Sequence, residues 1–184
     1  MTFVTVDGKG NPNTSEEYQS AIEALYGLSY TIKMSKMSGA QPKGYYDFVV
    51  PPLEGLWWLD DGSDYWIKDK DRYCWTSMIR LPEFVNAAVF ETAKNELARK
   101  KPHIDTSRAR LLTFSEGLCV QAMHMGSYDD EPRTNDAIKT FIADNGYVSD
   151  ICDTRRHHEI YLNDPRKVAP EKLRTILRHP VRMV

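Results

Sequence analysis

The strongest constraint on the fold is a pattern that occurs twice along the chain. Residues 6–28 run from a strand end through a glycine turn and an amphipathic stretch to a second glycine, and residues 124–147 follow the same order. In both stretches apolar residues recur at three- and four-residue spacing, which is typical of a helix buried on one side. Such a repeat indicates a tandem β-α-β-β duplication. Chance similarity of two such units is the alternative.

Alternation of apolar residues and the positions of turn residues locate the other elements. We predict strands over residues 2–6, 46–58, 72–81, 110–114, 118–125 and 157–163, and helices over 14–36, 82–101, 133–145 and from 170 to about 180. Pro51 and Pro52 interrupt the second strand, because proline cannot donate a hydrogen bond to a neighbouring strand. The 184 residues are therefore interpreted as one domain of two pseudo-repeats, about 1–105 and 106–184.

Charge balance and apolar content exclude several classes of protein. Twenty-four Lys and Arg residues against 26 Asp and Glu residues give a net charge of −2, whereas a dedicated nucleic-acid binder needs a concentrated positive surface. No run of about 18 apolar residues is present, and the N-terminus lacks the features of a secretory signal. Three widely spaced cysteines fit a reducing compartment. We expect a cytoplasmic protein without direct nucleic-acid or membrane binding.

Aromatic residues make up 11% of the chain, and the four tryptophans fall in two predicted strands and the loop between them. Trp57 and Trp58 are neighbours in one strand and therefore point to opposite faces of a sheet. An indole on an open face, with Tyr and Met side chains nearby, offers a flat apolar wall for a planar ligand. Core packing of all four, which include Trp66 and Trp75, is the alternative.

The predicted strand over 157–163 carries a candidate acid. Glu159 and Tyr161 share one face of this strand. If Ile160 and Leu162 pack on helices, the acid and the phenol point to the opposite face. On a face open to water Glu159 would be an ordinary solvated carboxylate, and in a pocket it would be a buried acid with a phenol beside it. Periodicity alone does not distinguish these two cases.

Other chemistries find no support in the spacing of residues. Potential metal ligands gather at Cys152, His157, His158 and Glu159, but no zinc-binding spacing is present, and adjacent strand residues diverge. A nucleophile elbow and a phosphate-binding loop are missing as well. We therefore expect no metal and no cofactor.

Two segments resemble the GyrI-like small-molecule-binding proteins. They are Pro-Pro-Leu-Glu-Gly-Leu-Trp-Trp at 51–58 and His-His-Glu-Ile-Tyr-Leu-Asn-Asp-Pro-Arg-Lys at 157–167, the latter followed by Pro-Glu-Lys-Leu at 170–173. The resemblance extends over nearly the whole chain. It implies an α+β fold of tandem β-α-β-β (SHS2-like) modules, with an antiparallel sheet, helices on one face, and a ligand cleft between the halves on the other. It further implies that Glu159 lies in this cleft among aromatic residues.

Members of this family serve as effector domains of multidrug-responsive activators, as gyrase inhibitors and as toxin-protection proteins. Some stand-alone members similar to this chain hydrolyse the strained cyclopropane of DNA-alkylating natural products. No helix-turn-helix segment is evident in these residues, so the activator role is not expected.

The residues and the resemblance together lead to one functional hypothesis. We expect binding, with hydrolytic detoxification, of planar apolar or electrophilic small molecules. Glu159 would neutralise a ligand cation or act as general base on a water molecule, and Tyr161 would orient the carboxylate. The candidate ligand contacts are aromatic, methionine and acidic side chains: Trp57, Trp58, Trp75, Tyr46, Met78, Met123 and Glu54.

Three alternatives to this hypothesis stay open. The chain could be a multidrug-binding sink or sensor without turnover, a module that binds gyrase or another protein partner, or a fold whose cleft is filled by its own side chains. The sequence does not determine the natural ligand or the oligomeric state.

Overall fold

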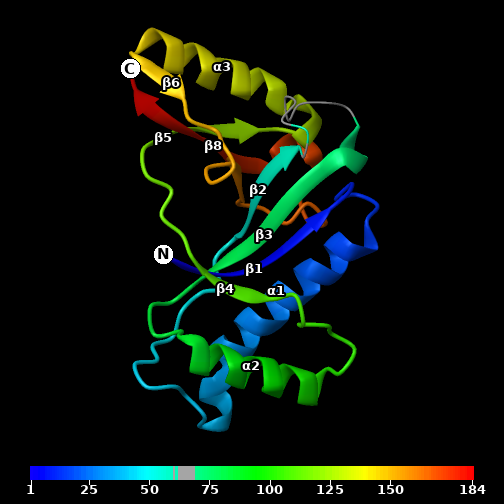
Figure 1. Ribbon diagram of the computed structural model, residues 1–184. Coiled ribbons are helices and arrows are strands. Elements are labelled where there is room, and N and C mark those ends of the chain that lie inside the picture. Colours follow the sequence, from blue (N-terminus) through cyan, green and yellow to red (C-terminus); the bar gives the residue numbers. More distant parts are fainter. Residues whose placement is uncertain (60, 62–68) are drawn as a thin grey trace. The chain divides into compact units, whose positions relative to one another are not determined.

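A computed structural model of the protein describes residues 1–59, 61 and 69–184 (Figure 1). Packing divides the chain into unit 1, Met1–Pro51 and Lys70–Phe114, and unit 2, Pro52–Asp69 and Ser115–Val184. Trp66 lies outside the described residues. Both units combine helices with antiparallel strands, which confirms the α+β class. These units are defined by contacts and not by internal similarity, so the boundary between pseudo-repeats near residue 105 stays a prediction.

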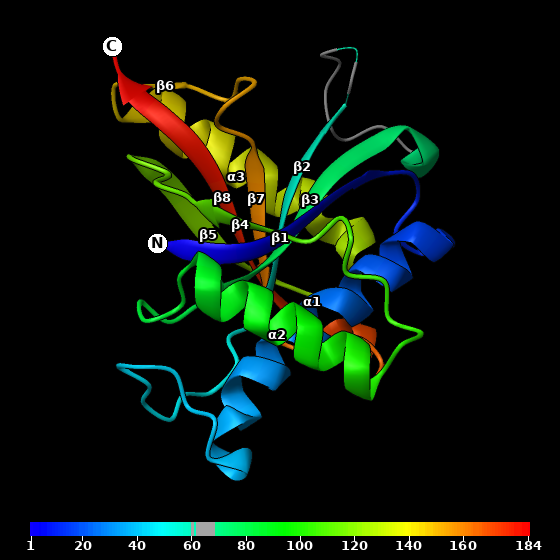
Figure 2. The ribbon, with the colours of Figure 1, turned by 60° about the horizontal axis from the view of Figure 1, so that its bottom comes forward.

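Unit 1 combines three antiparallel strands with helices. Its strand β1 (Thr2–Lys9) pairs with β3 (Tyr73–Leu81) on one side and β4 (Arg110–Thr113) on the other. Helix α1 (Glu16–Met34) packs on β1 and β3, and α2 (Ala87–Lys100) packs on α1 (Figure 2). The 3₁₀ turns η1 (Ser35–Ser38) and η2 (Lys70–Arg72) complete this unit.

Capping residues explain where the helices of unit 1 begin. Ser15 accepts a hydrogen bond from the backbone N–H of Tyr18, so α1 begins one residue later, two residues beyond its predicted start. Asn86 accepts from the backbone N–H of Val89, so α2 begins at Ala87, although Pro82 suggested an earlier start. In the predicted helix over 82–101, residues 82–85 thus form a turn before the helix.

The first strand is longer than predicted because Gly8 lies opposite Trp75. A Cβ atom at Gly8 would lie 2.2 Å from two carbons of the Trp75 ring. Gly8 and Lys9 were expected to form a turn. They instead continue β1, since glycine leaves the space that the indole fills.

Unit 2 contains five antiparallel strands among its described residues. Its strands follow the order β2-β7-β8-β5, with the short strand β6 also paired to β8. The bounds are β2 (Leu53–Leu59), β5 (Cys119–Met125), β6 (Tyr147–Ser149), β7 (His157–Tyr161) and β8 (Arg174–Met183). Strand β2 begins directly after Pro51-Pro52, as the missing proline donors require.

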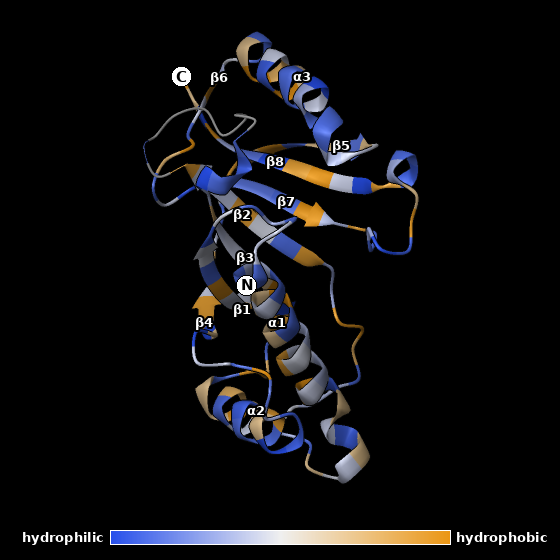
Figure 3. Ribbon diagram, turned by 90° about the vertical axis from the view of Figure 1, so that its right-hand side faces the viewer, coloured by the Kyte–Doolittle hydropathy of each residue, from blue (hydrophilic) through white to orange (hydrophobic). Residues whose placement is uncertain are grey.

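Helix α3 (Glu131–Asp144) covers the sheet of unit 2 over β5, β6 and β8. Its apolar side chains Ile138 and Ile142 form a core with Leu177 and Val181 of β8. Figure 3 shows polar and apolar residues mixed along α3, as expected of a helix with one buried side. The turns η3 (Tyr128–Asp130) and η4 (Pro170–Lys172) precede α3 and β8.

The predicted helix from residue 170 to about 180 is wrong. Only the turn η4 is helical, and the residues from Arg174 onward form β8. Strand β8 pairs with β5, β6 and β7, and alternate side chains from Thr175 to Val181 face α3. These long-range pairings outweigh a local sequence that also fits a short helix. Among the described residues, no helix is long and apolar enough to cross a membrane.

Candidate functional site

The strand register of unit 2 determines which side chains share a face. Glu159 lies opposite Leu177 of β8 and opposite Gly55 of β2. Directly opposed residues of antiparallel strands project to the same face, and Leu177 packs under α3. Glu159, with Tyr161 and Trp57 at alternate positions of their strands, therefore lies on the face that carries α3.

The premise that Ile160 and Leu162 pack on helices is wrong for unit 2. Ile160 lies opposite Ile176, on the face away from α3, and Leu162 lies beyond the end of β7. Three consecutive polar residues of β7, 157–159, are buried. Because successive side chains of a strand point to opposite faces, both faces of β7 are shielded. Apolar side chains therefore do not mark the helix-covered face of this strand.

Trp57 and Tyr161 meet above Gly55. The indole Nε1–H of Trp57 donates to the Oη of Tyr161 over 2.8 Å. A Cβ atom on residue 55 would lie 2.6 Å from Trp57 Nε1 and 3.1 Å from Tyr161 Oη. Only glycine leaves this space, so Gly55 brings the indole and the phenol to the strand position opposite Glu159.

Tyr128 is a third aromatic residue at this place, and sequence reasoning missed it. Its ring lies edge-on to that of Tyr161, with centroids 5.8 Å apart. Burial, followed by the nearby charge of Glu159, raises the pKa of Tyr128 to about 12. The phenol therefore keeps its proton near neutral pH and can donate a hydrogen bond. No local pattern could have identified it, because Tyr128 lies in an irregular turn.

His124 on β5 fixes the turn that carries Tyr128. Its Nε2 lies 2.9 Å from the backbone oxygen of Ser127, and its Nδ1 lies 2.9 Å from Oγ1 of Thr134 on α3. The imidazole thus bridges the turn and the helix from a fully buried position. The position of Tyr128 is therefore fixed in two ways: His124 holds the backbone of its turn, and its ring packs on Tyr161.

Glu159 itself pairs with a histidine of its own strand. His157 Nε2 lies 3.1 Å from Glu159 Oε1, and the two side chains are 3% and 4% exposed, respectively. The ring of His157 lies edge-on to that of His179 on β8, with centroids 4.9 Å apart. Burial, together with the nearby His157 and Lys139, lowers the pKa of His179 to about 3. The main feature of this face is thus the buried Glu159. It contacts His157, whose ring packs on His179, and it lies near aromatic rings.

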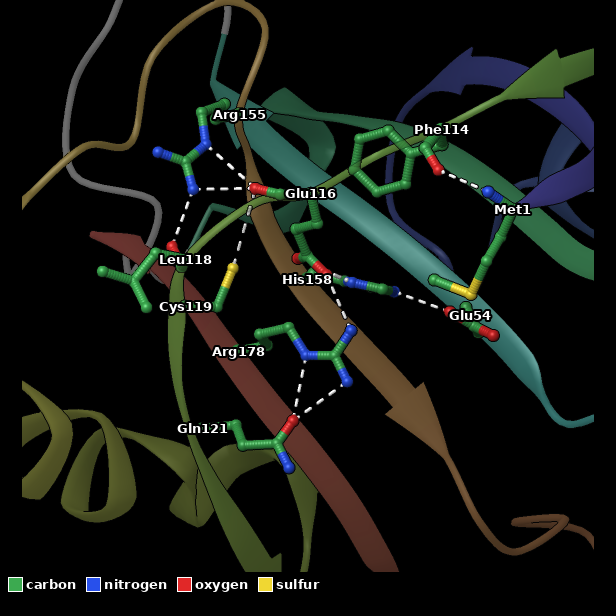
Figure 4. A network of polar contacts seen from close by, with 10 residues as sticks. All are labelled: Met1, Glu54, Phe114, Glu116, Leu118, Cys119, Gln121, Arg155, His158 and Arg178. Atoms are coloured by element: carbon green, nitrogen blue, oxygen red, sulfur yellow. Dashed lines mark hydrogen bonds and ion pairs between the residues drawn. The ribbon is translucent and has the colours of Figure 1, made fainter. Parts of the chain in front are cut away.

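Glu54, expected as a ligand contact, lies on the opposite face in a separate network (Figure 4). Its Oε2 lies 2.8 Å from His158 Nε2, and Glu116 Oε1 lies 2.9 Å from His158 Nδ1. Arg178 pairs with the other oxygen of Glu116 over 2.7 Å, and its guanidinium also donates to Gln121. Two carboxylates, one imidazolium and one guanidinium make this network electrically neutral when His158 is protonated.

The two central groups of this network stabilise each other's charged forms. Burial alone would lower the pKa of His158, but hydrogen bonds to Glu116 and Glu54 raise it above its usual value. Burial alone would raise the pKa of Glu116, but His158 and Arg178 lower it below its usual value. This arrangement is typical of a structural ion network, and it engages the carboxylate of Glu54.

The other predicted ligand contacts of unit 2 are spread over its surfaces. Trp58 lies on the face away from α3, where the guanidinium of Arg156 stacks 4.8 Å from its ring centroid. Met123 on β5 is 47% exposed. Of the two neighbouring tryptophans, Trp57 is the one that shares a face with Glu159.

Three further predicted contacts belong to unit 1. Trp75 is fully buried and lies edge-on to Tyr18 of α1, with ring centroids 5.0 Å apart, and Met78 is fully buried as well. Tyr46 is 49% exposed, and its hydroxyl donates to Glu83 over 2.9 Å. Each has a packing or hydrogen-bonding partner within unit 1, and their part in ligand binding stays a prediction.

Among residues 1–59, 61 and 69–184, no group of three or more His, Cys, Asp or Glu side chains could hold a metal ion. Cys152 lies in a turn where its backbone pairs with Arg155.

The chain is similar to one protein family and to several solved structures. The model of the GyrI-like small molecule binding domain matches residues 1–182. A crystal structure of an uncharacterized conserved protein from Listeria innocua is 51% identical, has a TM-score of 0.94, and covers 99% of this chain and 88% of its own. Another from that organism, described as a hydrolase, is 49% identical, with a TM-score of 0.90 and coverage of 99% and 87%.

A more distant structure shares the fold alone. The C-terminal domain of EcmrR is 13% identical, with a TM-score of 0.55 and coverage of 100% of this chain and 92% of its own. Among curated proteins, none is similar enough to this chain to count as a match.

Proposed function

This chain belongs to the GyrI-like small-molecule-binding family, and from this premise we propose that it binds planar apolar or electrophilic molecules and detoxifies them by hydrolysis in the cytoplasm. The observation that carries the proposal is a carboxylate, Glu159, that is only 3% exposed and shares a face with aromatic side chains. The crystal structure described as a hydrolase, 49% identical to this chain, supports the hydrolytic part. Direct nucleic-acid binding is not part of the proposal.

The proposed site, here called the acid–aromatic site, consists of Glu159, Trp57, Tyr161 and Tyr128. Trp57 and the two phenols supply apolar rings against which a planar ligand can stack. The hydroxyl of Tyr161 accepts from Trp57, which strengthens it as a donor in turn. Tyr128 keeps its proton and offers a second donor. A carboxylate within such a group of rings suits a ligand cation and also suits a water molecule that must lose a proton.

The hydrolysis we propose opens a strained three-membered ring that is conjugated to a carbonyl. Water attacks a ring carbon, Glu159 takes the proton that the water loses, and one carbon–carbon bond breaks. The electron pair of that bond passes to the conjugated carbonyl, where a phenol donor stabilises the developing oxyanion. The proton on Glu159 then passes to the ring-opened product, so water is added overall and the carboxylate is regenerated. General-base assistance of this kind is typically worth about 10²–10⁴-fold in rate.

A Glu159→Gln variant tests the assignment against a Glu171→Gln control, which makes the same change at an exposed position. The rate at which each variant hydrolyses a cyclopropane-containing alkylator is measured by chromatography of the product. We expect this rate to fall by about 100-fold or more in Glu159→Gln and to stay unchanged in Glu171→Gln. Tryptophan quenching by a neutral planar ligand should stay within about threefold of wild type, because the aromatic rings are retained.

Three results would contradict parts of this function. Hydrolysis at the wild-type rate in Glu159→Gln would show that Glu159 is not the base. Quenching by planar ligands with no product on prolonged incubation of the wild-type protein would favour a multidrug-binding sink or sensor. A partner protein that binds regardless of small molecules would favour an interaction module.

A further inference from the structure

The carboxylate of Glu159 has a buried partner to which the proposed function assigns no part. His157 Nε2 lies 3.1 Å from Glu159 Oε1, and both side chains are almost completely shielded from solvent. The two residues lie two positions apart on β7, so their side chains leave the strand on the same face. A carboxylate that acts as a base has no hydrogen to give, so the proposed function requires the imidazole to donate this bond through Nε2–H.

The orientation of His157 is set by a second histidine and by helix α3. The ring of His179 lies edge-on to the ring of His157, at an interplanar angle of 83°. Because its pKa is lowered to about 3, His179 is neutral near physiological pH. Its Nε2–H then donates to Oδ1 of Asn135 over 2.9 Å, and the amide nitrogen of Asn135 donates to the backbone oxygen of Glu131. The α3 helix thus fixes Asn135, which fixes His179, which packs on the imidazole of His157.

Burial makes a partner of this kind necessary. An ionised carboxylate that leaves water loses its solvation, and a hydrogen bond to its charged form is the usual compensation. A glutamate side chain also has three rotatable bonds, and a base or a cation-binding group acts well only when it is held in one geometry. One N–H donor at 3.1 Å can serve both purposes.

We propose that His157 is a positioning residue that holds the carboxylate of Glu159 in one orientation for the ligand or the attacking water. This inference rests on the proposed function of the acid–aromatic site. His157 acts through Glu159 and does not itself contact the ligand. Its donor Nε2–H is the essential feature, and its ring volume is not.

Two variants separate the donor from the volume of the side chain. His157→Gln keeps an N–H donor at about the reach of Nε2, and His157→Leu removes it. With the cyclopropane-containing alkylator, we expect kcat of the Leu variant to fall about 10- to 100-fold with KM within about threefold, and the Gln variant to recover most of the loss. Equal rates in the two variants, whether reduced or at the wild-type level, would overturn the inference.

A measurement of ligand binding tests the inference without depending on turnover. Ethidium, a planar aromatic cation, should bind more weakly to Glu159→Gln than to wild type. His157→Leu should weaken ethidium about tenfold, and His157→Gln should restore it. If the wild-type protein hydrolyses nothing, the hydrolytic function fails while this pattern still supports His157 as the positioning residue. Equal ethidium affinity in both His157 variants would overturn it.

Nitrogen-15 spectra of the histidine rings give a third measurement that needs no ligand. We expect the His157 Nε2 of the wild-type protein to carry a proton that exchanges slowly with solvent. An unprotonated Nε2 at neutral pH would overturn the inference, whatever the activity.

Discussion

Gly55 of β2 lies opposite Glu159 of β7. Because glycine has no side chain, other groups can occupy the space above this pair. The indole of Trp57 and the hydroxyl of Tyr161 occupy that space and bond to each other. The acid–aromatic site is therefore built partly by a residue that contributes no atom to it. Glycine at this position costs some backbone entropy, and it permits the close approach of two aromatic groups.

We predict that Gly55→Ala displaces Trp57 and weakens the site. The added Cβ would lie 2.6 Å from Trp57 Nε1, and such overpacking costs about 1–3 kcal/mol of unfolding free energy. Urea unfolding should show this loss, and planar ligands should bind more weakly in tryptophan fluorescence.

The matched control for this change is Gly55→Ala in a Trp57→Phe background. The phenyl ring lacks the nitrogen that the new methyl group would meet, so the added cost of the alanine should shrink. An alanine penalty of the same size in both backgrounds would mean that the indole is not the cause.

At this scale the sequence predicts some of the site and not the rest. The period of two in a strand correctly predicts that Glu159 and Tyr161 share a face, and that Trp57 and Trp58 do not. It carries no information about Tyr128 or His179, because these come from a turn and a distant strand. Their contacts with Tyr161 and His157 exist only once the chain has folded.

At the scale of elements, β8 shows why a local pattern is insufficient. Residues 174–183 form a strand because three neighbouring strands pair with them, although the segment from 170 was predicted to be helical. The neighbouring residues His157 and His158 of β7 likewise point to opposite faces of the sheet and have different partners. His157 supports Glu159, and His158 joins Glu54 and Glu116 on the other side.

This second network should stabilise unit 2, and Glu116→Gln tests it. The change removes one buried charge and leaves His158 and Arg178 without full compensation, which typically costs about 3 kcal/mol or more. The control is Asp153→Asn, whose side chain is 98% exposed in a surface pair with Arg156, where about 0–1 kcal/mol is expected. Equal midpoints in urea unfolding would show that the buried network contributes no more than the surface pair.

At the scale of the whole molecule, the unusual pKa values of the histidines predict how stability depends on pH. In the unfolded chain His179 is protonated below about pH 6.5, whereas in the fold it stays neutral down to about pH 3. The unfolded state therefore binds more protons in this window, and stability falls as pH falls, by about 1.4 kcal/mol per pH unit from this group.

The two central groups of the other network contribute with opposite signs. His158 has a raised pKa, so its contribution is present below about pH 6.5 and is lost as pH rises through its folded value. Glu116 has a lowered pKa, so its contribution is present above about pH 4.3 and is lost as pH falls through its folded value. Together, His179 and His158 place maximal stability at about pH 6.5.

Urea unfolding at a series of pH values measures this profile. We expect His179→Gln to flatten the slope between about pH 4 and pH 6.5, because the variant has no imidazole to protonate on unfolding. An unchanged acid slope in this variant would show that His179 is not the group responsible.

Resemblance to the GyrI-like family implies the α+β class and the antiparallel sheet. Local patterns alone predict the positions of most strands and helices, and which neighbouring residues of a strand point to opposite faces. These follow from local geometry, since a strand alternates its side chains and a helix repeats every three to four residues. The folded chain shows that Glu159 lies on the face of α3, that Glu54 pairs with His158, and that Tyr128 and His179 lie beside Tyr161 and His157. The physical reason is that burial and hydrogen-bond partners depend on the register between distant strands, which no local periodicity encodes.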